Sequence, residues 1–431
     1  MFRLIMVSIL VTLAGCVDQS RDVSEAGSPV GSSASESSAS ADVTSSDGGV
    51  SESDTNPKRE VLLNVGENII LPAYKALRDN AAVFSGDGSA ITDYCNAIGT
   101  ETEAEMRFQT KARLNDLVDS IQVVEMLLLG PLVANEGGLH HRIHPYIDFP
   151  LATCSLDQAV VSHTEGDYSI DIRASNQKGL PAIEYLLANP SLNHSCPAQV
   201  PATQGWNGLS EVERKRQRCN LAQTIAVDVA DATASAFALW DPEDGNFLSE
   251  FTRDINTGAN FQVLSDALFY VEKNTKSRKL TVPLGLDSDC STVTCGALVE
   301  SPYLERSLDN IAINLETFLL IYEGGADFGF DDIIEQAGFP DVNQRFRDQV
   351  IAARTNAENA SVGLAEQVKT LADSGRSADC VNAFANPDAE DKSFSACNLA
   401  GLVKRVTDDL KIDFVTIIEV SIPGNVQSDN D

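Results

Sequence analysis

Apolar residues recur every three or four positions over most of this chain, and this periodicity constrains the fold more than any other feature. The clearest case runs from Leu304 to Tyr322, where apolar side chains share one helical face and a Gly-Gly pair ends the pattern. Similar faces recur over residues 70–84, 114–128, 156–163, 180–187, 222–240, 249–273, 346–371 and 399–418. No stretch sustains the alternation of a strand. The pattern therefore predicts an all-α protein built from helical bundles.

Breaks in this periodicity predict irregular segments. Pro72 interrupts the first helical face and predicts a kink or a late helix start. Residues 85–100 are polar and residues 135–150 are rich in Gly and His, so both are expected to be loops. Residues 190–208, rich in Pro, Gly and Asn, predict a domain boundary or a long excursion, and residues 281–302 predict another loop.

Residues 1–15 predict a lipoprotein signal peptide. Arg3 supplies a positive charge, and the apolar run 4–13 is too short to span a bilayer. Small residues directly precede Cys16, and this sequence resembles the bacterial lipobox, in which the Cys becomes the lipidated first residue. No Asp follows Cys16 directly, which favours the outer membrane by the sorting rules of enteric-type bacteria. An ordinary secretory signal with an incidental Cys is the alternative.

The rest of the chain divides into a linker and two bundles. Residues 16–59 predict a lipid-anchored, disordered acidic linker, because they hold almost no large apolar residue and cannot offset their ordering entropy by burial. We expect an N-terminal helical bundle over 60–205 and a C-terminal bundle over 206–425. The 31 basic and 63 acidic residues give a formal charge of −32, and such a surface repels nucleic acid.

Eight cysteines remain after Cys16 is set aside, and an even number in an exported chain indicates disulfides. They form no Cys-x-x-Cys pair, which disfavours a zinc ribbon. Their spacing favours bonds between near neighbours. On this basis we expect the pairs Cys290–Cys295, Cys380–Cys397, Cys196–Cys219 and, by elimination, Cys95–Cys154.

Residues 179–187 predict the opening of a helix. Gly179 stands at a flexible entry, and Pro181 suits the first turn, where an N–H would be unpaired anyway. Glu184 lies one turn in, where a carboxylate favours the positive end of the helix dipole. The apolar residues of this stretch recur at helical spacing and would face a core.

The stretch resembles the Gly-x-His-x-x-Glu signature of the imelysin-like family, which comprises all-helical bacterial envelope proteins linked to iron uptake, some of them classed as metallopeptidases. Pro181 stands where the signature has His. Further fragments that resemble the family follow in order over about 61–420, at Ile70–Tyr74, Leu129–Leu132, His144–Tyr146, Leu264–Leu268, Lys279–Gly285 and Glu300–Tyr303. The resemblance implies two helical domains and a cleft between them, lined by the signature helix.

The resemblance also implies a set of ligand-binding residues near this cleft. They are Gly179, Pro181, Glu184, Arg142, Asp266, Glu300 and Arg306. Glu184 is the candidate metal ligand, and a ligand role would make Glu184→Gln weaken binding. Carboxylates such as Asp266, Glu300 and Glu316 could hold iron or another hard cation through oxygen. The alternatives are salt bridges to the two arginines and, for Glu184, an ordinary helix-start carboxylate.

Three histidines form the densest group of imidazoles, at His140, His141 and His144. On a helix, the first and third would share a face, and such pairs bind zinc or copper. A Gly-Gly pair and Pro145 flank them, so surface histidines in a loop are favoured over a metal site.

These features support three hypotheses about function. The first is a membrane-anchored binding protein that holds an iron species or another small ligand in iron acquisition. The second is a metallopeptidase using Glu184, although Pro181 removes the motif's imidazole and no His-Glu-x-x-His is present. The third is a non-catalytic scaffold that assists an outer-membrane iron transporter.

Overall fold

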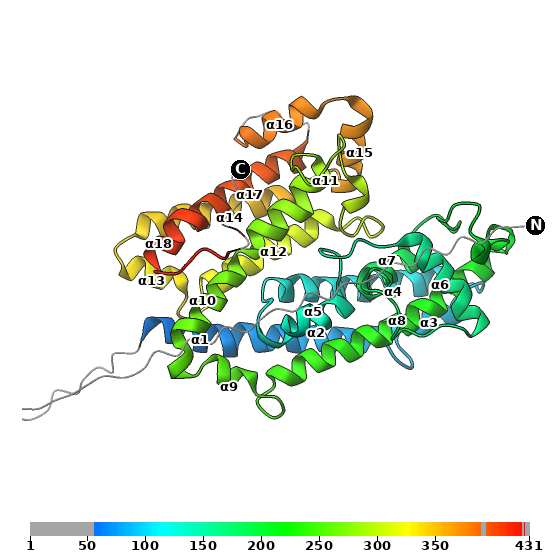
Figure 1. The fold of residues 1–431 in the computed structure, drawn as a ribbon, viewed down its shortest axis with the longest axis horizontal. Helices are drawn as coiled ribbons and strands as arrows, with labels where there is room; N and C mark the ends of the chain where they lie inside the picture. The colour runs from blue at the N-terminus through cyan, green and yellow to red at the C-terminus, as the bar shows by residue number, and fades with distance from the viewer. Residues whose placement is uncertain (1–55, 389–393, 425, 427–431) are drawn as a thin grey trace, which may run out of the picture. The chain divides into compact units, whose positions relative to one another are not determined.

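The computed structural model describes residues 56–388, 394–424 and 426. The predictions about the signal peptide, about lipidation of Cys16 and about the linker up to residue 55 lie outside this part of the chain. All regular secondary structure of the described residues is helical, with no strand among them, which confirms the all-α prediction (Figure 1). None of the described helices has both the length and the apolarity needed to cross a bilayer.

The helices have these bounds: α1 Pro57–Val65, α2 Leu71–Phe84, α3 Ala90–Ala97, α4 Glu103–Glu125, α5 Ala134–Ile143, α6 Thr153–Glu165, α7 Gly179–Ala188, α8 Glu211–Trp240, α9 Phe247–Phe251, α10 Thr257–Leu268, α11 Val282–Leu284, α12 Ser307–Tyr322, α13 Phe330–Gln336, α14 Pro340–Glu358, α15 Leu364–Ser374, α16 Ser377–Ala385, α17 Ser395–Asp409 and α18 Val415–Ile417. Three π-helical segments adjoin them, at Gly66–Ile70, Val271–Thr281 and Leu410–Phe414.

Helical structure begins within the predicted linker. The side chain of Asn56 accepts a hydrogen bond from the Lys58 N–H (3.1 Å) and caps α1, and Pro57 takes its first position. Residues 57–59 therefore belong to α1. The irregularity expected at Pro72 is present as the π-helical segment Gly66–Ile70, directly before the turn that holds this proline.

Two segments that were predicted to be loops contain helices. Residues 85–100 hold α3, whose cap Ser89 accepts a hydrogen bond from the Thr92 N–H. Residues 135–150 hold most of α5, because a left-handed turn that ends at Gly137 (φ 75°) leads into the helix. The loop prediction was wrong because Gly137 belongs to the turn that starts a helix.

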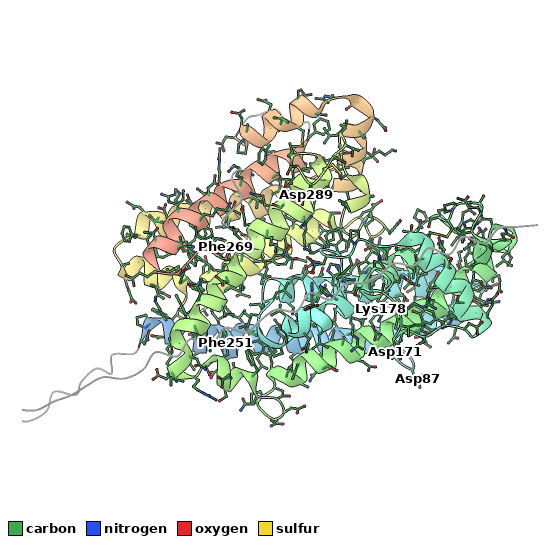
Figure 2. The ribbon with its side chains drawn as sticks, viewed as in Figure 1. Asp87, Asp171, Lys178, Phe251, Phe269 and Asp289 are labelled. Carbon is green, nitrogen blue, oxygen red and sulfur yellow. A yellow bond between two sulfur atoms is a disulfide. The ribbon has the colours of Figure 1, made fainter. Side chains whose placement is uncertain are left out.

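Two stretches predicted as single helices are divided. Residues 249–273 comprise most of α9, all of α10 and the start of a π-helical segment, and the buried rings of Phe251 and Phe269 lie near the breaks (Figure 2). Residues 346–371 divide between α14 and α15. Apolar side chains stay buried on both sides of each break, so their spacing alone does not reveal it. The segment 281–302 is irregular as expected, apart from the end of the π-helical segment at Thr281, the single turn α11 and a 3-10 turn at Gly296–Leu298.

The long helix α8 holds several of the earlier helices together. This helix packs most extensively on α7 and α2 and also contacts α3, α5 and α6. Among the later helices, α12 and α17 both pack on α14, while α4 contacts both α2 and α12. The predicted boundary at residue 205 thus separates α8 from its main packing partners. The division into two domains stays a prediction.

Four disulfides join the eight cysteines, and two of the expected pairs are confirmed, Cys290–Cys295 and Cys380–Cys397. The other two expected pairs were wrong. The structure has Cys95–Cys219 and Cys154–Cys196 instead. The reason is tertiary packing, because α3 lies on α8 and brings together cysteines that are 124 residues apart.

Candidate functional site

A small cavity lies beside α7, which carries the stretch 179–187 and is called the signature helix below. Its volume is about 80 Å³, and its lining includes Pro181 and Glu184 of this helix, His144 after α5, and residues 299–303 before α12. Three members of the predicted ligand-binding set, Pro181, Glu184 and Glu300, therefore meet at one cavity, together with His144 of the histidine group.

Gly179 is required at the start of the signature helix. Its φ is +70°, and a Cβ there would lie 2.6 Å from the Ile143 carbonyl oxygen and 2.7 Å from the Pro145 Cδ atom. A larger residue would push the signature helix away from the chain around His144. This glycine therefore allows the close approach that brings the helix to the imidazole of the cavity.

That imidazole comes from a histidine whose surroundings were predicted wrongly. His140 lies in α5 and His144 directly follows it, and both are buried, whereas the sequence favoured surface residues in a loop. His141 is more exposed and pairs with Asp148 (3.0 Å). Pro181 leaves the signature without its own imidazole, but His144 supplies one to the same cavity.

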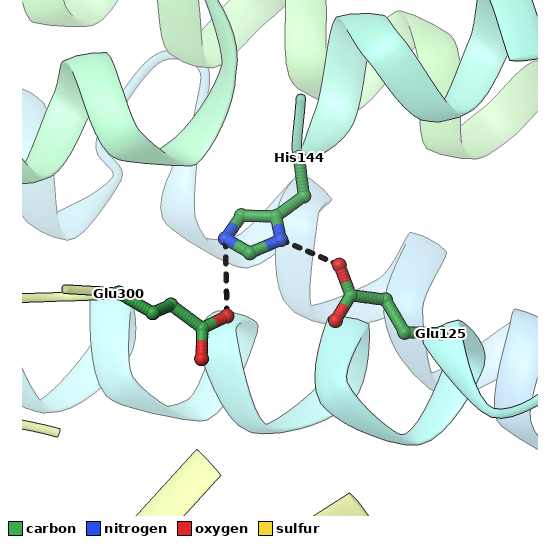
Figure 3. A group of neighbouring side chains, drawn as sticks. All are labelled: Glu125, His144 and Glu300. Atoms are coloured by element: carbon green, nitrogen blue, oxygen red, sulfur yellow. Dashed lines mark hydrogen bonds and ion pairs between the residues drawn. The ribbon is translucent and has the colours of Figure 1, made fainter. Parts of the chain in front are cut away.

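His144 lies between two buried glutamates (Figure 3). Its Nδ1 atom is 2.6 Å from Oε1 of Glu125, and its Nε2 atom is 3.8 Å from Oε1 of Glu300. One potential ligand atom from each of these three residues lies within 4.8 Å of the others. His140 Nε2 is also 3.4 Å from Oε1 of Glu125. The end of α4, the end of α5 and the chain before α12 thus converge.

A buried lysine compensates part of the negative charge. The Lys279 ammonium donates a hydrogen bond to Glu125 Oε2 (3.0 Å) and lies 3.3 Å from Glu300 Oε1. It also donates to the side-chain oxygens of Gln122 (2.5 Å) and Asn314 (2.9 Å). Lys279 belongs to the π-helical segment Val271–Thr281, and such segments are frequent at functional sites.

The charged groups of this network shift one another's pKa values. Burial opposes ionisation of Glu125, but the Lys279 ammonium and the His144 imidazole outweigh it and hold the pKa of Glu125 well below its usual range. Burial also opposes charging of His144, but the carboxylates of Glu125 and Glu300 outweigh it and raise the pKa of His144. The network therefore favours an ionised Glu125 beside a protonated His144.

Two carboxyl groups at the cavity differ in their partners. Glu300 accepts a hydrogen bond from Gln122 through Oε1 (3.0 Å), while its Oε2 atom is buried without a hydrogen-bond partner. Glu184 Oε1 accepts hydrogen bonds from the backbone N–H groups of Tyr303 (2.7 Å) and Leu304 (3.0 Å). Burial raises the pKa of Glu184 to about 7, and these N–H groups oppose it in part.

The other predicted site residues do not line this cavity. Arg142 pairs with an aspartate of α8 (2.7 Å), and Arg306 pairs with an aspartate of α4. Asp266 accepts a hydrogen bond from the glutamine one turn earlier in α10 (2.7 Å). Glu316 is exposed on α12. The set implied by the resemblance is therefore divided between the cavity and other parts of the molecule.

Four residues of this network were not identified as site residues from the sequence, namely Glu125, Lys279, Gln122 and Asn314. A weak signal was available, because Gln122 and Glu125 directly follow apolar core residues of α4 and are themselves completely buried. A charged residue that falls near the apolar face of a helix indicates a buried polar network. The sequence does not show which other helices complete such a network.

A larger hollow of about 780 Å³ lies among α14, α15 and α17. Asp388 is the charged residue of its described lining, and this residue pairs with Arg405. Neutral side chains such as Asn356, Gln367 and Asn398 make up most of the polar remainder. We place the candidate site at the smaller cavity because an imidazole and two carboxyl groups line it.

Comparisons with known proteins agree with this fold. The family model described as Imelysin (peptidase M75) matches residues 70–390. An imelysin-like protein from Psychrobacter arcticum 273-4 has a similar structure, with a TM-score of 0.59 and 13% identity over 86% of this chain and 98% of that one. A putative iron-regulated protein A precursor from Parabacteroides distasonis ATCC 8503 gives a TM-score of 0.54 and 12% identity over 82% and 95% of the two chains. A search of curated proteins gave no match.

Proposed function

The chain belongs to the imelysin family, and from this premise we propose that it is an envelope protein that binds a metal cation, with iron as the first candidate, at the cavity beside the signature helix. The observation that carries the proposal is the Oε2 atom of Glu300, which is buried without a hydrogen-bond partner, while the Oε1 atom of the same carboxylate lies 3.8 Å from His144 Nε2. A buried carboxylate oxygen without a partner is costly unless a ligand satisfies it.

The donor set fits a transition-metal cation. Imidazole and carboxylate are ligands that iron, zinc and copper share, and the group of Glu125, His144 and Glu300 offers one imidazole and two carboxylates. With both carboxylates ionised and Lys279 charged, these groups carry one net negative charge when His144 is neutral. A bound cation would therefore take the place of the proton on His144.

Iron is preferred as the cation because of the family. One similar solved structure is described as a putative iron-regulated protein A precursor, and this description applies to that protein. For this chain we propose a part in iron acquisition, anchored to the outer membrane through lipid on Cys16 and assisting an iron transporter there. Labelled fatty acid should enter the full chain but not a Cys16→Ser variant, and equal labelling of both would contradict the anchor.

Peptidase activity is not expected. A hydrolytic zinc site needs three protein ligands and an open position for water. Pro181 supplies no ligand atom where the signature has His, and Oε1 of Glu184 already accepts hydrogen bonds from two backbone N–H groups. Casein hydrolysis that is sensitive to a chelator and abolished by Glu300→Gln would overturn this expectation.

Metal analysis tests the proposal directly. The full chain, purified in detergent without chelators, should retain substoichiometric to stoichiometric iron, and Glu300→Gln should retain much less. Glu316→Gln is a matched control, because it makes the same chemical change at an exposed position of α12. Equal iron in wild type and Glu300→Gln would place any metal elsewhere. Absence of both bound metal and binding on titration would favour the scaffold hypothesis.

A further inference from the structure

We propose that Glu184 is a positioning residue, which holds residues 300–306 and thereby places Glu300 for the cation, instead of binding the cation itself. This inference rests on the proposed function and assigns the signature glutamate a different part in it. The two backbone N–H groups that Glu184 accepts belong to Tyr303 and Leu304, within this segment.

The segment that Glu184 holds has a strained backbone. Ser301 (φ 45°) and Glu305 (φ 61°) both adopt left-handed conformations, although neither is a glycine. Such conformations are costly for residues other than glycine and persist only where the surroundings enforce them. Residues 300–306 would therefore relax to another path if their contacts were removed.

Several contacts enforce this path. The Ser307 hydroxyl donates a hydrogen bond to the Glu300 carbonyl oxygen, and Arg306 pairs with Asp119 of α4. Glu184 supplies the hydrogen bonds between the segment and the signature helix, and a single oxygen accepts both of them. The rings of Tyr185 and Tyr303 form a second contact between the two, with 5.4 Å between their centroids. Without the Glu184 carboxylate, both backbone N–H groups would lack a hydrogen-bond partner inside the protein. This cost would favour a different backbone conformation of the segment.

The path of the segment determines where Glu300 lies. Glu300 immediately precedes Ser301, and its carboxylate reaches Gln122, Lys279 and His144 from this position. Glu184 has Oε1 engaged by two N–H groups, so this atom is not free to bind a metal. The geometry therefore favours an effect of Glu184 on cation binding that passes through the position of Glu300.

Two substitutions separate positioning from ligation. Glu184→Gln keeps a carbonyl oxygen that accepts the same N–H groups but removes the charge, whereas Glu184→Ala removes both. If Glu184 positions the segment, the Gln variant keeps its function. If Glu184 is an anionic ligand, the Gln variant loses cation binding as the Ala variant does. The sequence alone led to the opposite expectation, that Gln would weaken binding.

The test combines two measurements on the full chain in detergent, with Glu316→Gln as the control for an exposed site. Amide hydrogen exchange of residues 299–306 should be about tenfold or more faster in Glu184→Ala and within about threefold of wild type in Glu184→Gln. Anaerobic titration with Fe(II) should follow the same order, with about tenfold weaker binding in Glu184→Ala and little change in Glu184→Gln.

The outcomes separate this inference from the proposed function. Equal loss of Fe(II) binding in both variants, with unchanged exchange, would make Glu184 a ligand and overturn the inference. If wild type binds no Fe(II), the proposed function fails, while the exchange comparison still decides whether Glu184 holds the segment. If Glu184→Ala does not fold, Glu184→Asp replaces it, because it keeps the charge but draws the acceptor oxygen back from both N–H groups by one methylene, and unchanged exchange in that variant would contradict the inference.

Discussion

Two buried charge networks meet the signature helix at consecutive residues. At Tyr185, both carboxylate oxygens of Asp157 accept hydrogen bonds, from Tyr185 (3.0 and 2.9 Å) and from Ser195 (2.7 and 2.9 Å). Asp157 also pairs with Arg218 (3.3 Å), whose Nε atom is buried without a hydrogen-bond partner. At Glu184, the helix instead holds the segment that carries Glu300, whose Oε2 atom lacks a partner.

The difference indicates what each network does. The Asp157 network ties the excursion 190–208 to α6, α7 and α8, and the Cys154–Cys196 disulfide ties it at a second point. Every acceptor atom of Asp157 is used, so it has nothing left for a ligand. The Glu300 carboxylate is buried and has an acceptor atom without a partner, and a bound cation would satisfy this atom. We interpret the first as structural and the second as functional.

Breaking the structural network should have the largest effect on stability. Asp157→Asn leaves the buried Arg218 without its carboxylate, and loss of one partner of a buried ion pair costs about 3–5 kcal/mol. Urea denaturation should show this loss, while Fe(II) affinity stays within about threefold of wild type. A cost below about 1 kcal/mol, or a parallel loss of Fe(II) binding, would remove the distinction between the networks.

The ionisation of Glu184 should make stability depend on pH. Its pKa is raised from 4.5 to about 7 in the folded state, so the folded protein binds this proton more tightly than the unfolded chain does. Its contribution is full below about pH 4.5 and is lost as the pH rises through about 7, by about 3 kcal/mol at 1.36 kcal/mol per pKa unit.

Glu184→Gln isolates this contribution. The difference in unfolding free energy between wild type and Glu184→Gln should move in favour of the variant as the pH rises from 4.5 to 8, because glutamine does not titrate. A difference that stays constant over this range would show that burial does not shift the pKa of Glu184 as described.

Cation binding should depend on pH through His144. Because neighbouring carboxylates raise its pKa above the usual value of about 6.5, the imidazole must lose a proton to bind a metal. Fe(II) affinity should therefore increase with pH, by up to about tenfold per pH unit, until the pH exceeds that raised pKa. Affinity independent of pH between 6 and 8 would exclude His144 as a ligand.

The fold could largely be predicted from the sequence where apolar spacing was unbroken. The face of α12 is an example, since it is buried throughout and ends at the Gly-Gly pair that was expected to end it. The prediction for α5 was wrong because Gly137 and Pro145 indicate a loop locally, although a left-handed turn and a helix end accommodate them. Local signals of this kind do not contain the tertiary contacts that stabilise the helix.

The site could be predicted only in part, for the same reason. Glu184 and Glu300 were found because they lie on segments that resemble the family. Glu125 and Lys279 were missed because they are 154 residues apart and meet only when α4 packs beside the π-helical segment. The disulfide Cys95–Cys219 is a further contact between distant residues that spacing along the chain did not reveal.

One calorimetric titration tests the central claim most directly, that the unsatisfied carboxylate of Glu300 belongs to a cation site. Fe(II) is titrated anaerobically at pH 8 into wild type, Glu300→Gln and the surface control Glu316→Gln. We predict saturable binding to wild type and to the control, and at least about tenfold weaker binding to Glu300→Gln, a loss of about 1.4 kcal/mol. Equal binding to all three proteins, or none to wild type, would contradict the account.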